Sequence, residues 1–159
     1  MLIGLIKTMR PKQWFKNVFV FAPLIFDEKL FNLRYVLPTI GGFILLCLTS
    51  GTVYIINDLA DIENDRNHPK KRLRPLAAGE VSIAVAQIAA VVVPLIALPL
   101  GFLLDFWLGL ILSAYLLLQI AYSFWLKDLV IIDVMVVASG FLLRVAAGVP
   151  LVDAKRFSP

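Results

Sequence analysis

The sequence contains little charge, one cysteine and one histidine. Charged residues make up 16% of the chain and hydrophobic residues 60%. In a typical soluble domain, about a quarter of the residues are charged and about half are hydrophobic. Cys47 has no second cysteine, which excludes a disulfide within the chain. His68 has no second histidine or nearby cysteine, so we assign it to loop structure rather than to a metal site. These deficits exclude an ordinary soluble enzyme and indicate a polytopic membrane protein.

Hydrophobic segments predict an all-α fold with about five membrane-spanning helices. Uncharged runs cover residues 35–56, 81–104 and 106–126, and each has the roughly 20 residues needed to cross the hydrocarbon core. The apolar run near the N-terminus is shorter, but a crossing there puts both basic clusters on the cytoplasmic side, as the positive-inside rule prefers. We therefore expect one domain over residues 1–159, with spans at 13–31, 35–56, 81–104, 106–126 and 129–149.

Basic residues are placed beside the apolar segments. The net charge is +4, and positive charge next to membrane spans indicates contact with a lipid surface rather than with nucleic acid. Two expected spans separate the N-terminus from the polar loop after residue 56, so both lie on the same side of the membrane, which we expect to be the cytoplasmic side. We expect the lipid bilayer to be the main partner of the chain and expect no nucleic acid.

The strongest polar signal lies at the end of the expected span 35–56. On a helix of about 100° per residue, Asn57, Asp58, Asp61 and Asp65 fall within an arc of roughly 100°. Carboxylates on one face repel one another unless a cation lies among them. An oxygen-only ligand set favours Mg²⁺, which commonly joins a few carboxylates to phosphates of a substrate.

A basic run follows the acidic residues directly. It contains five cations within nine positions: Arg66, Lys70, Lys71, Arg72 and Arg74. Some of them serve equally well as cytoplasmic membrane anchors, so only part of the set need contact phosphate. Acidic residues for a metal beside basic residues for phosphate predict a site for a diphosphate-bearing small molecule.

Two charged residues fall inside the last expected span. Asp133 and Arg144 are costly at membrane depth and usually face a partner or a wet cavity. Arg144 lies about 16 Å further along the helix than Asp133, so Lys127 is the nearer partner for that aspartate. Lys127 itself is equally compatible with ordinary placement at the membrane interface.

Several motifs resemble one superfamily of membrane enzymes. The pattern Asn57-Asp58-x-x-Asp61-x-x-x-Asp65-Arg66 resembles the first aspartate-rich motif of the UbiA-type intramembrane prenyltransferases. Other stretches are similar to one branch, the decaprenyl-phosphate phosphoribosyltransferases: residues 10–17 (RPKQWFKN), 21–24, 65–75, 122–127 and 140–144.

The resemblance implies a fold and a reaction. The superfamily has nine membrane helices and a second polar motif after the sixth, so we expect this chain to correspond to the N-terminal half of that fold. The branch transfers a 5-phosphoribosyl group from phosphoribosyl diphosphate to a polyprenyl (decaprenyl) phosphate in cell wall biosynthesis, which implies the bacterial inner membrane. The implied Mg²⁺ ligands and catalytic residues are Asp58, Asp61 and Asp65. The implied substrate-binding residues are Asn57, Arg66, Lys71, Arg72, Arg74, Lys16, Asn17, Tyr122 and Lys127.

Two alternatives stay open. A prenyltransferase that acts on an aromatic acceptor also expels Mg²⁺-bound pyrophosphate, so the acidic motif does not separate it from a phosphoribosyltransferase. A truncated half of a transferase, inserted in the membrane but unable to turn over, would carry the same motifs. Transfer of label from phosphoribosyl diphosphate to lipid tests the first alternative. Reading the gene past codon 159 tests the second: further spans there would indicate a fragment of a full-length enzyme, and their absence a catalytically inactive or accessory protein.

Overall fold

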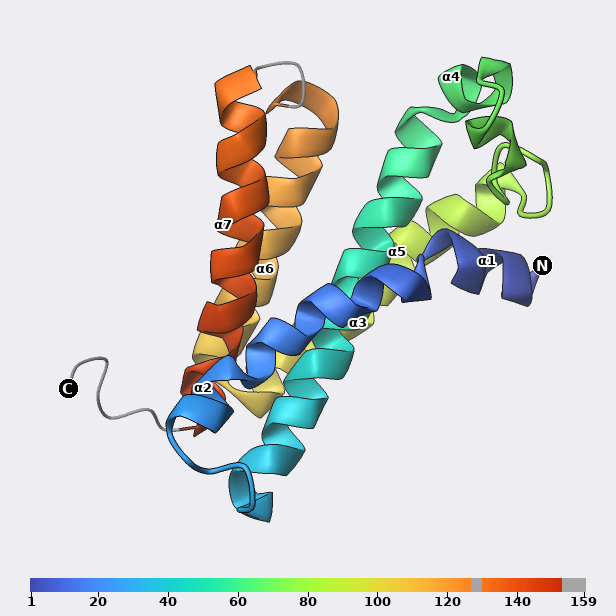
Figure 1. Ribbon diagram of the computed structural model, residues 1–159. Coiled ribbons are helices and arrows are strands. Elements are labelled where there is room, and N and C mark those ends of the chain that lie inside the picture. The colour runs from blue at the N-terminus through green and yellow to red at the C-terminus, as the bar shows by residue number, and fades with distance from the viewer. Residues whose placement is uncertain (127–129, 153–159) are drawn as a thin grey trace.

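The computed structural model describes residues 1–126 and 130–152, except for the side chains of Leu126, Val130 and Asp133, and every regular element in these ranges is helical (Figure 1). Four long helices form its frame: α3 (Leu33–Ala60), α5 (Ile83–Leu104), α6 (Phe106–Ala121) and α7 (Val130–Gly148). The shorter elements are α1 (Leu2–Thr8), η1 (Pro11–Phe21), α2 (Ala22–Phe26), α4 (Ile62–Asn67), η2 (Lys71–Leu73), η3 (Tyr122–Leu126) and η4 (Pro150–Val152).

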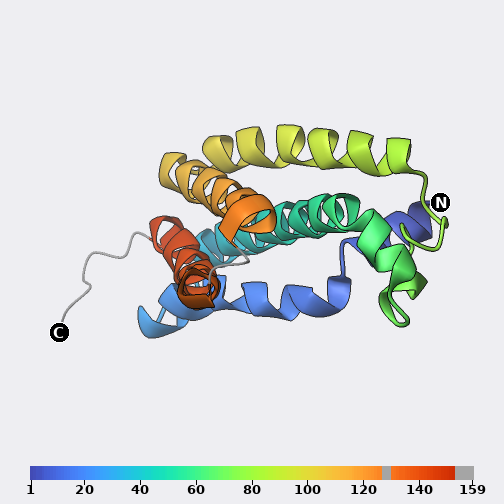
Figure 2. The same ribbon diagram turned by 90° about the horizontal axis from the view of Figure 1, so that it is seen from above.

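Helix α3 is the central element of the bundle. It lies between α5 and η1, and the paired helices α6 and α7 cross at one end (Figure 2). In its most apolar stretch 61% of α3 is buried, against 17% for α5. The uncovered side of α5 is apolar, with exposed Ile88, Val91 and Leu95, which suits contact with lipid rather than water.

Within the part of the chain that the structure describes, four segments have the length and hydropathy to cross a membrane: Leu33–Ala60, Ile83–Leu104, Phe106–Trp125 and Val134–Val152. They overlap the four later spans expected from the sequence, with different bounds. Helix α6 continues into η3, a single π-helical turn.

The first expected span, 13–31, has a different form from the others. Its residues fall in an 11-residue 3₁₀-helix, η1, followed by the short helix α2 and a turn. A 3₁₀-helix rises about 2.0 Å per residue, so η1 and α2 together extend roughly 30 Å, close to the thickness of the hydrocarbon core. Crossing by this segment stays a prediction.

The 3₁₀ winding of η1 aligns every third side chain. Residues three apart eclipse one another in such a helix, and Trp14, Asn17 and Val20 form one row. Asn17 and Val20 are fully buried, Trp14 is half-buried, and its indole N–H donates to the carbonyl of Met9 at 3.1 Å. This row attaches η1 to the bundle and brings a polar amide into the interior.

Side-chain caps begin three of the long helices. Asn32 accepts from the Arg34 N–H, and Ser82 from the Val85 N–H. Asp105 accepts from the N–H groups of Trp107 and Leu108 at 2.8 and 3.1 Å. Asp105 also follows the last residue of α5 directly, so one residue ends that helix and caps the next.

Helix α7 contacts η1 at a site with no room for a side chain. A Cβ atom on Gly148 would collide with the carbonyl oxygen of Val20, and backbone atoms cannot move aside as a flexible side chain can. At Gly41 an added Cβ would meet only the terminal Cδ2 of Leu104, at 3.1 Å.

We expect Gly148→Ala to destabilise the protein by about 1–3 kcal/mol, because overpacking must separate η1 from α7. Gly41→Ala is the matched control and should be neutral or slightly stabilising, since alanine favours helix more than glycine does. Thermal unfolding in detergent measures both changes. Equal melting temperatures for the two variants would contradict the close contact.

Candidate functional site

The acidic motif spans a break between two helices. The sequence predicts one continuous helical face from Asn57 to Asp65, but α3 ends at Ala60 and α4 begins at Ile62. Asp61 between them has φ −99° and ψ 10°, outside helical geometry. Hydrogen bonds from Asp61 N–H to the Asn57 carbonyl and from Asp65 N–H to the Asp61 carbonyl cross the break. The expectation of a single helix is therefore wrong, although Asp58 and Asp65 still approach each other.

Two arginines hold these two carboxylates. Arg74 Nη1 donates to Asp65 Oδ2 at 2.6 Å and to Asp58 Oδ1 at 3.2 Å, and Arg10 Nη2 also pairs with Asp58 Oδ1. Asp58 is 2% exposed and Asp65 is 1% exposed, so both charges require partners. The four charges sum to zero, so this network of ion pairs is electroneutral.

Arg10 is a site residue that sequence reasoning missed. It belongs to the motif in residues 10–17, but no role for its side chain is predicted from the sequence. Its backbone has φ 53°, a strained conformation for a non-glycine residue, and strain of this kind gathers at functional sites. Its guanidinium lies 4.7 Å from the ring centroid of Tyr54 and pairs with Asp58. Nothing in the local sequence predicts that the residue before Pro11 adopts a left-handed helical backbone conformation.

The metal prediction has partial geometric support. Asp65 Oδ1 is buried without a hydrogen-bond partner, and such an oxygen suits a cation. In the part of the chain that the structure describes, however, no three His, Cys, Asp or Glu side chains are grouped to hold a metal. Arg10 and Arg74 occupy the carboxylates instead. The oxygen donors therefore fit Mg²⁺ in chemistry, and the neutral network favours a dication that arrives together with an anionic ligand.

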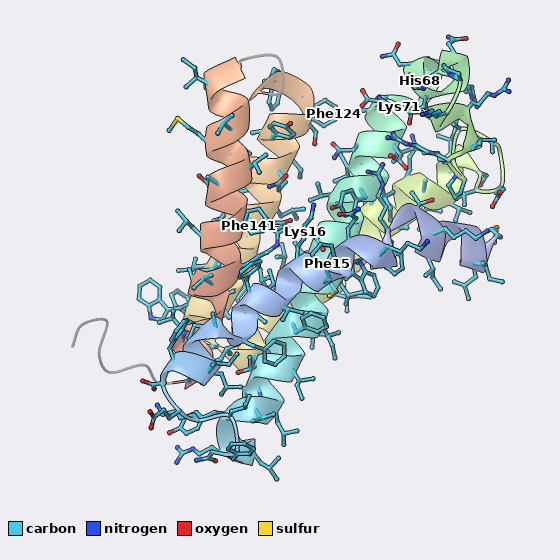
Figure 3. The ribbon with its side chains drawn as sticks, in the orientation of Figure 1. Phe15, Lys16, His68, Lys71, Phe124 and Phe141 are labelled. Atoms are coloured by element: carbon cyan, nitrogen blue, oxygen red, sulfur yellow. The ribbon has the colours of Figure 1, made fainter. Side chains whose placement is uncertain are left out.

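A cavity of about 190 Å³ lies beside this network, between η1, α3, α6 and α7. One face of α3 contributes Ser50, Val53, Tyr54 and Asn57, whose spacing of three, four and seven residues covers about two helical turns. Figure 3 labels Lys16 on η1 and Phe141 on α7, which line it from two sides. The remaining lining residues are Tyr115, Gln119, Tyr122, Val137 and Arg144.

The end of the cavity away from Asn57 is built around Arg144. Its Nε donates to Asn17 Oδ1 at 2.9 Å, its Nη2 to the Tyr115 hydroxyl at 2.8 Å and its Nη1 to the Gly140 carbonyl at 2.7 Å. Asn17 in turn donates to Ser50 Oγ at 3.1 Å and to Cys47 Sγ at 3.3 Å. This chain of contacts joins η1, α3, α6 and α7.

The expected substrate-binding residues divide into three groups. Lys16, Asn57 and Tyr122 line the cavity, and Asn17 lies buried behind it. Arg74 belongs to the ion-pair network, whereas the loop residues Arg66, Lys71 and Arg72 are exposed. Arg66 pairs with Glu63 at 2.9 Å, and Lys71 lies far from Lys16 (Figure 3). Lys127 lies outside the described residues. Arg144 and Tyr115 join the site. The cost of an intramembrane charge and the motif at 140–144 pointed to Arg144, whereas no feature of the sequence pointed to Tyr115.

Comparison with known families agrees with this arrangement of membrane helices. The pattern of the UbiA prenyltransferase family matches residues 18–155, most of the chain. The chain belongs to the UbiA prenyltransferase family. Enzymes of this family are in general metal-dependent prenyltransferases, and the family together with four apolar helices makes the chain an integral membrane protein.

Curated relatives of this UbiA-family chain include decaprenyl-phosphate phosphoribosyltransferases. The protein of that name from Corynebacterium glutamicum is 40% identical over 149 residues, covering 91% of this chain and 45% of the relative. Those from Mycolicibacterium smegmatis and Mycobacterium tuberculosis are each 38% identical, covering 91% and 93% of this chain and 47% and 50% of the relatives. The chain spans about half the length of these relatives and matches their N-terminal half.

We expect Arg74→Met to destabilise the UbiA-family chain by about 3 kcal/mol, because two buried carboxylates would lose a shared cation. Arg72→Met, two residues earlier on an exposed side chain, should change stability by less than about 0.5 kcal/mol. Thermal or denaturant unfolding in detergent compares the variants. An Arg74→Met protein as stable as Arg72→Met would mean that the network does not hold the loop.

Proposed function

We propose that the chain forms the donor-binding half of a Mg²⁺-dependent intramembrane transferase. The reaction moves a 5-phosphoribosyl group from phosphoribosyl diphosphate to a polyprenyl phosphate at the cytoplasmic side of the bacterial inner membrane, in cell wall biosynthesis. The observation that carries the proposal is the cavity among apolar helices, which is lined by the cations Lys16 and Arg144 and adjoins the acidic motif through Tyr54 and Asn57. The named function of the relatives supports the choice of substrates.

In the proposed reaction, an oxygen of the polyprenyl phosphate forms a bond to C1 of the ribose, and the bond from C1 to the diphosphate breaks. The acceptor is already an anion at neutral pH, so no strong general base is required. Mg²⁺, when held by Asp58, Asp61 and Asp65, would neutralise charge on the departing pyrophosphate.

The side chains of the chain supply binding and orientation. Arg74, next to the two aspartates, is positioned to take a diphosphate oxygen once its carboxylates engage the metal. Lys16 and Tyr122 present a cation and a hydroxyl to the cavity, and Asn57 offers an amide beside the acidic motif. The apolar helix faces would accept the polyprenyl tail. Arg66, Lys71 and Arg72 sit in the exposed loop, where they would attract anionic substrate and lipid.

The competing function is prenyl transfer to an aromatic acceptor, which the family description favours. Membranes that contain the protein can be offered phosphoribosyl diphosphate labelled in the ribose together with polyprenyl phosphate. We expect label to appear in lipid. Label transfer only from a prenyl diphosphate to an aromatic acceptor would establish the competing function, and no transfer from either donor would establish that this chain alone does not turn over.

The role of Asp61 can be tested by binding alone. We expect Asp61→Asn to lose Mg²⁺-dependent binding of inorganic pyrophosphate, because it removes one carboxylate from the proposed metal site, while membrane insertion stays intact. The control is Glu63→Gln, since Glu63 is exposed and pairs only at the surface with Arg66. Isothermal titration in detergent measures the change. Equal pyrophosphate affinity for Asp61→Asn and the unmodified protein would contradict the proposal that Asp61 is a Mg²⁺ ligand.

A further inference from the structure

The cavity contains an unusual charge for a membrane interior. Arg144 is 8% exposed and lies on α7, within a segment apolar enough to cross a membrane. A guanidinium stays protonated in proteins, and a charge at this depth generally has a functional partner. No carboxylate forms an ion pair with Arg144 among the described residues.

The partners of Arg144 orient its charge without cancelling it. An amide oxygen, a hydroxyl and a backbone carbonyl accept three of its hydrogen bonds, and all three are neutral. A guanidinium has five N–H donors, so two remain for a ligand. The ring of Tyr115 lies 5.0 Å and that of Phe141 5.6 Å from its Cζ, which fixes the guanidinium plane further.

The rest of the lining also favours an anion. Among the residues whose side chains the structure describes, those around the cavity include two cations, Lys16 and Arg144, and no acidic side chain. Three tyrosine hydroxyls, one serine and two amides complete the polar lining. The serine hydroxyl already donates to the Cys47 carbonyl, whereas tyrosine hydroxyls and amides are groups that can donate hydrogen bonds to an anion. Toward the opposite end of the cavity, the charges of Arg10 and Arg74 are offset by the carboxylates of Asp58 and Asp65. Net positive charge therefore concentrates at Arg144 and Lys16.

We propose that Arg144 binds a phosphate monoester inside the cavity, with Lys16 as the second cation and Asn17 as the residue that positions the guanidinium. The inference rests on the proposed function and deepens it by assigning the place of one phosphate. Two ligands carry such a group: the polyprenyl phosphate and the 5-phosphate of the ribosyl donor. Both ligands would present a terminal phosphate dianion to two N–H groups of the guanidinium.

Two pairs of ligands that differ by one phosphate separate these sources. Farnesyl phosphate with farnesol represents the lipid acceptor, and ribose 5-phosphate with ribose represents the donor. The full chain in nanodiscs should bind one phosphate ligand at least about tenfold more tightly than its uncharged analogue, as charge-assisted hydrogen bonds imply. The pair with this gain identifies the phosphate that Arg144 holds.

Arg144→Gln should abolish the gain in affinity that the phosphate group provides over the uncharged analogue. Arg144→Lys should keep part of this gain in affinity because the positive charge remains. Arg34→Gln is the control, an exposed arginine at the opposite end of α3, and it should keep the full gain. These comparisons use binding alone, so they remain informative even if the transfer assay identifies a different reaction.

Asn17→Asp tests the same idea without removing the arginine. The variant places a carboxylate at the atom that already accepts from Arg144 Nε, so the cation gains an internal partner. We expect little change in thermal stability, because the new ion pair offsets the two hydrogen bonds that the Asn17 amide donates to Ser50 and Cys47, together with at least a tenfold loss of the phosphate-dependent gain in affinity. A purely structural arginine would give no such loss. The inference is overturned if Asn17→Asp keeps the gain, or if the unmodified chain shows no gain with either ligand pair.

Discussion

A buried carboxylate at the end of an apolar helix must find positive charge, and the site depends on how Asp58 does so. Arg10 and Arg74 reach it from opposite directions along the chain, 48 and 16 residues away. Their ion pairs join the N-terminal segment, the central helix α3 and the loop after α4. Because both charges of the aspartates are neutralised at once, the polar loop can pack Leu76 and Val81 against the apolar core.

The cavity therefore has two ends of different electrostatic character. Near Asn57 the charges of Asp58 and Asp65 are offset by those of Arg10 and Arg74. Near Arg144 the charge is positive and held in place by neutral acceptors. The two ends are about two helical turns apart along α3, as Ser50 and Asn57 mark. A ligand with two separated anionic groups matches this arrangement better than one with a single anionic group.

The sequence was sufficient for features that depend on local chemistry. Length and hydropathy predict the four long helices because a membrane span needs only an uninterrupted apolar run. The break at Asp61 and the strained backbone of Arg10 could not be predicted, since both depend on partners distant in the chain. The spacing of the aspartates indicated a shared face, but not that Arg74 would lie between Asp58 and Asp65. Arg144 was visible as an intramembrane charge, whereas its bond to Asn17 joins residues 127 positions apart.

The contact between Asn17 and Arg144 also selects the winding of η1. An 11-residue segment wound as an α-helix would be about 5 Å shorter than the same segment wound as a 3₁₀-helix. An α-helix has 3.6 residues per turn, so side chains three residues apart do not point in the same direction. Trp14, Asn17 and Val20 would therefore no longer lie in one row. Long 3₁₀-helices are intrinsically poor, so η1 depends on its buried row of side chains for its shape. The lateral position of Lys16 beside the cavity is thus determined by residues on α3, α6 and α7.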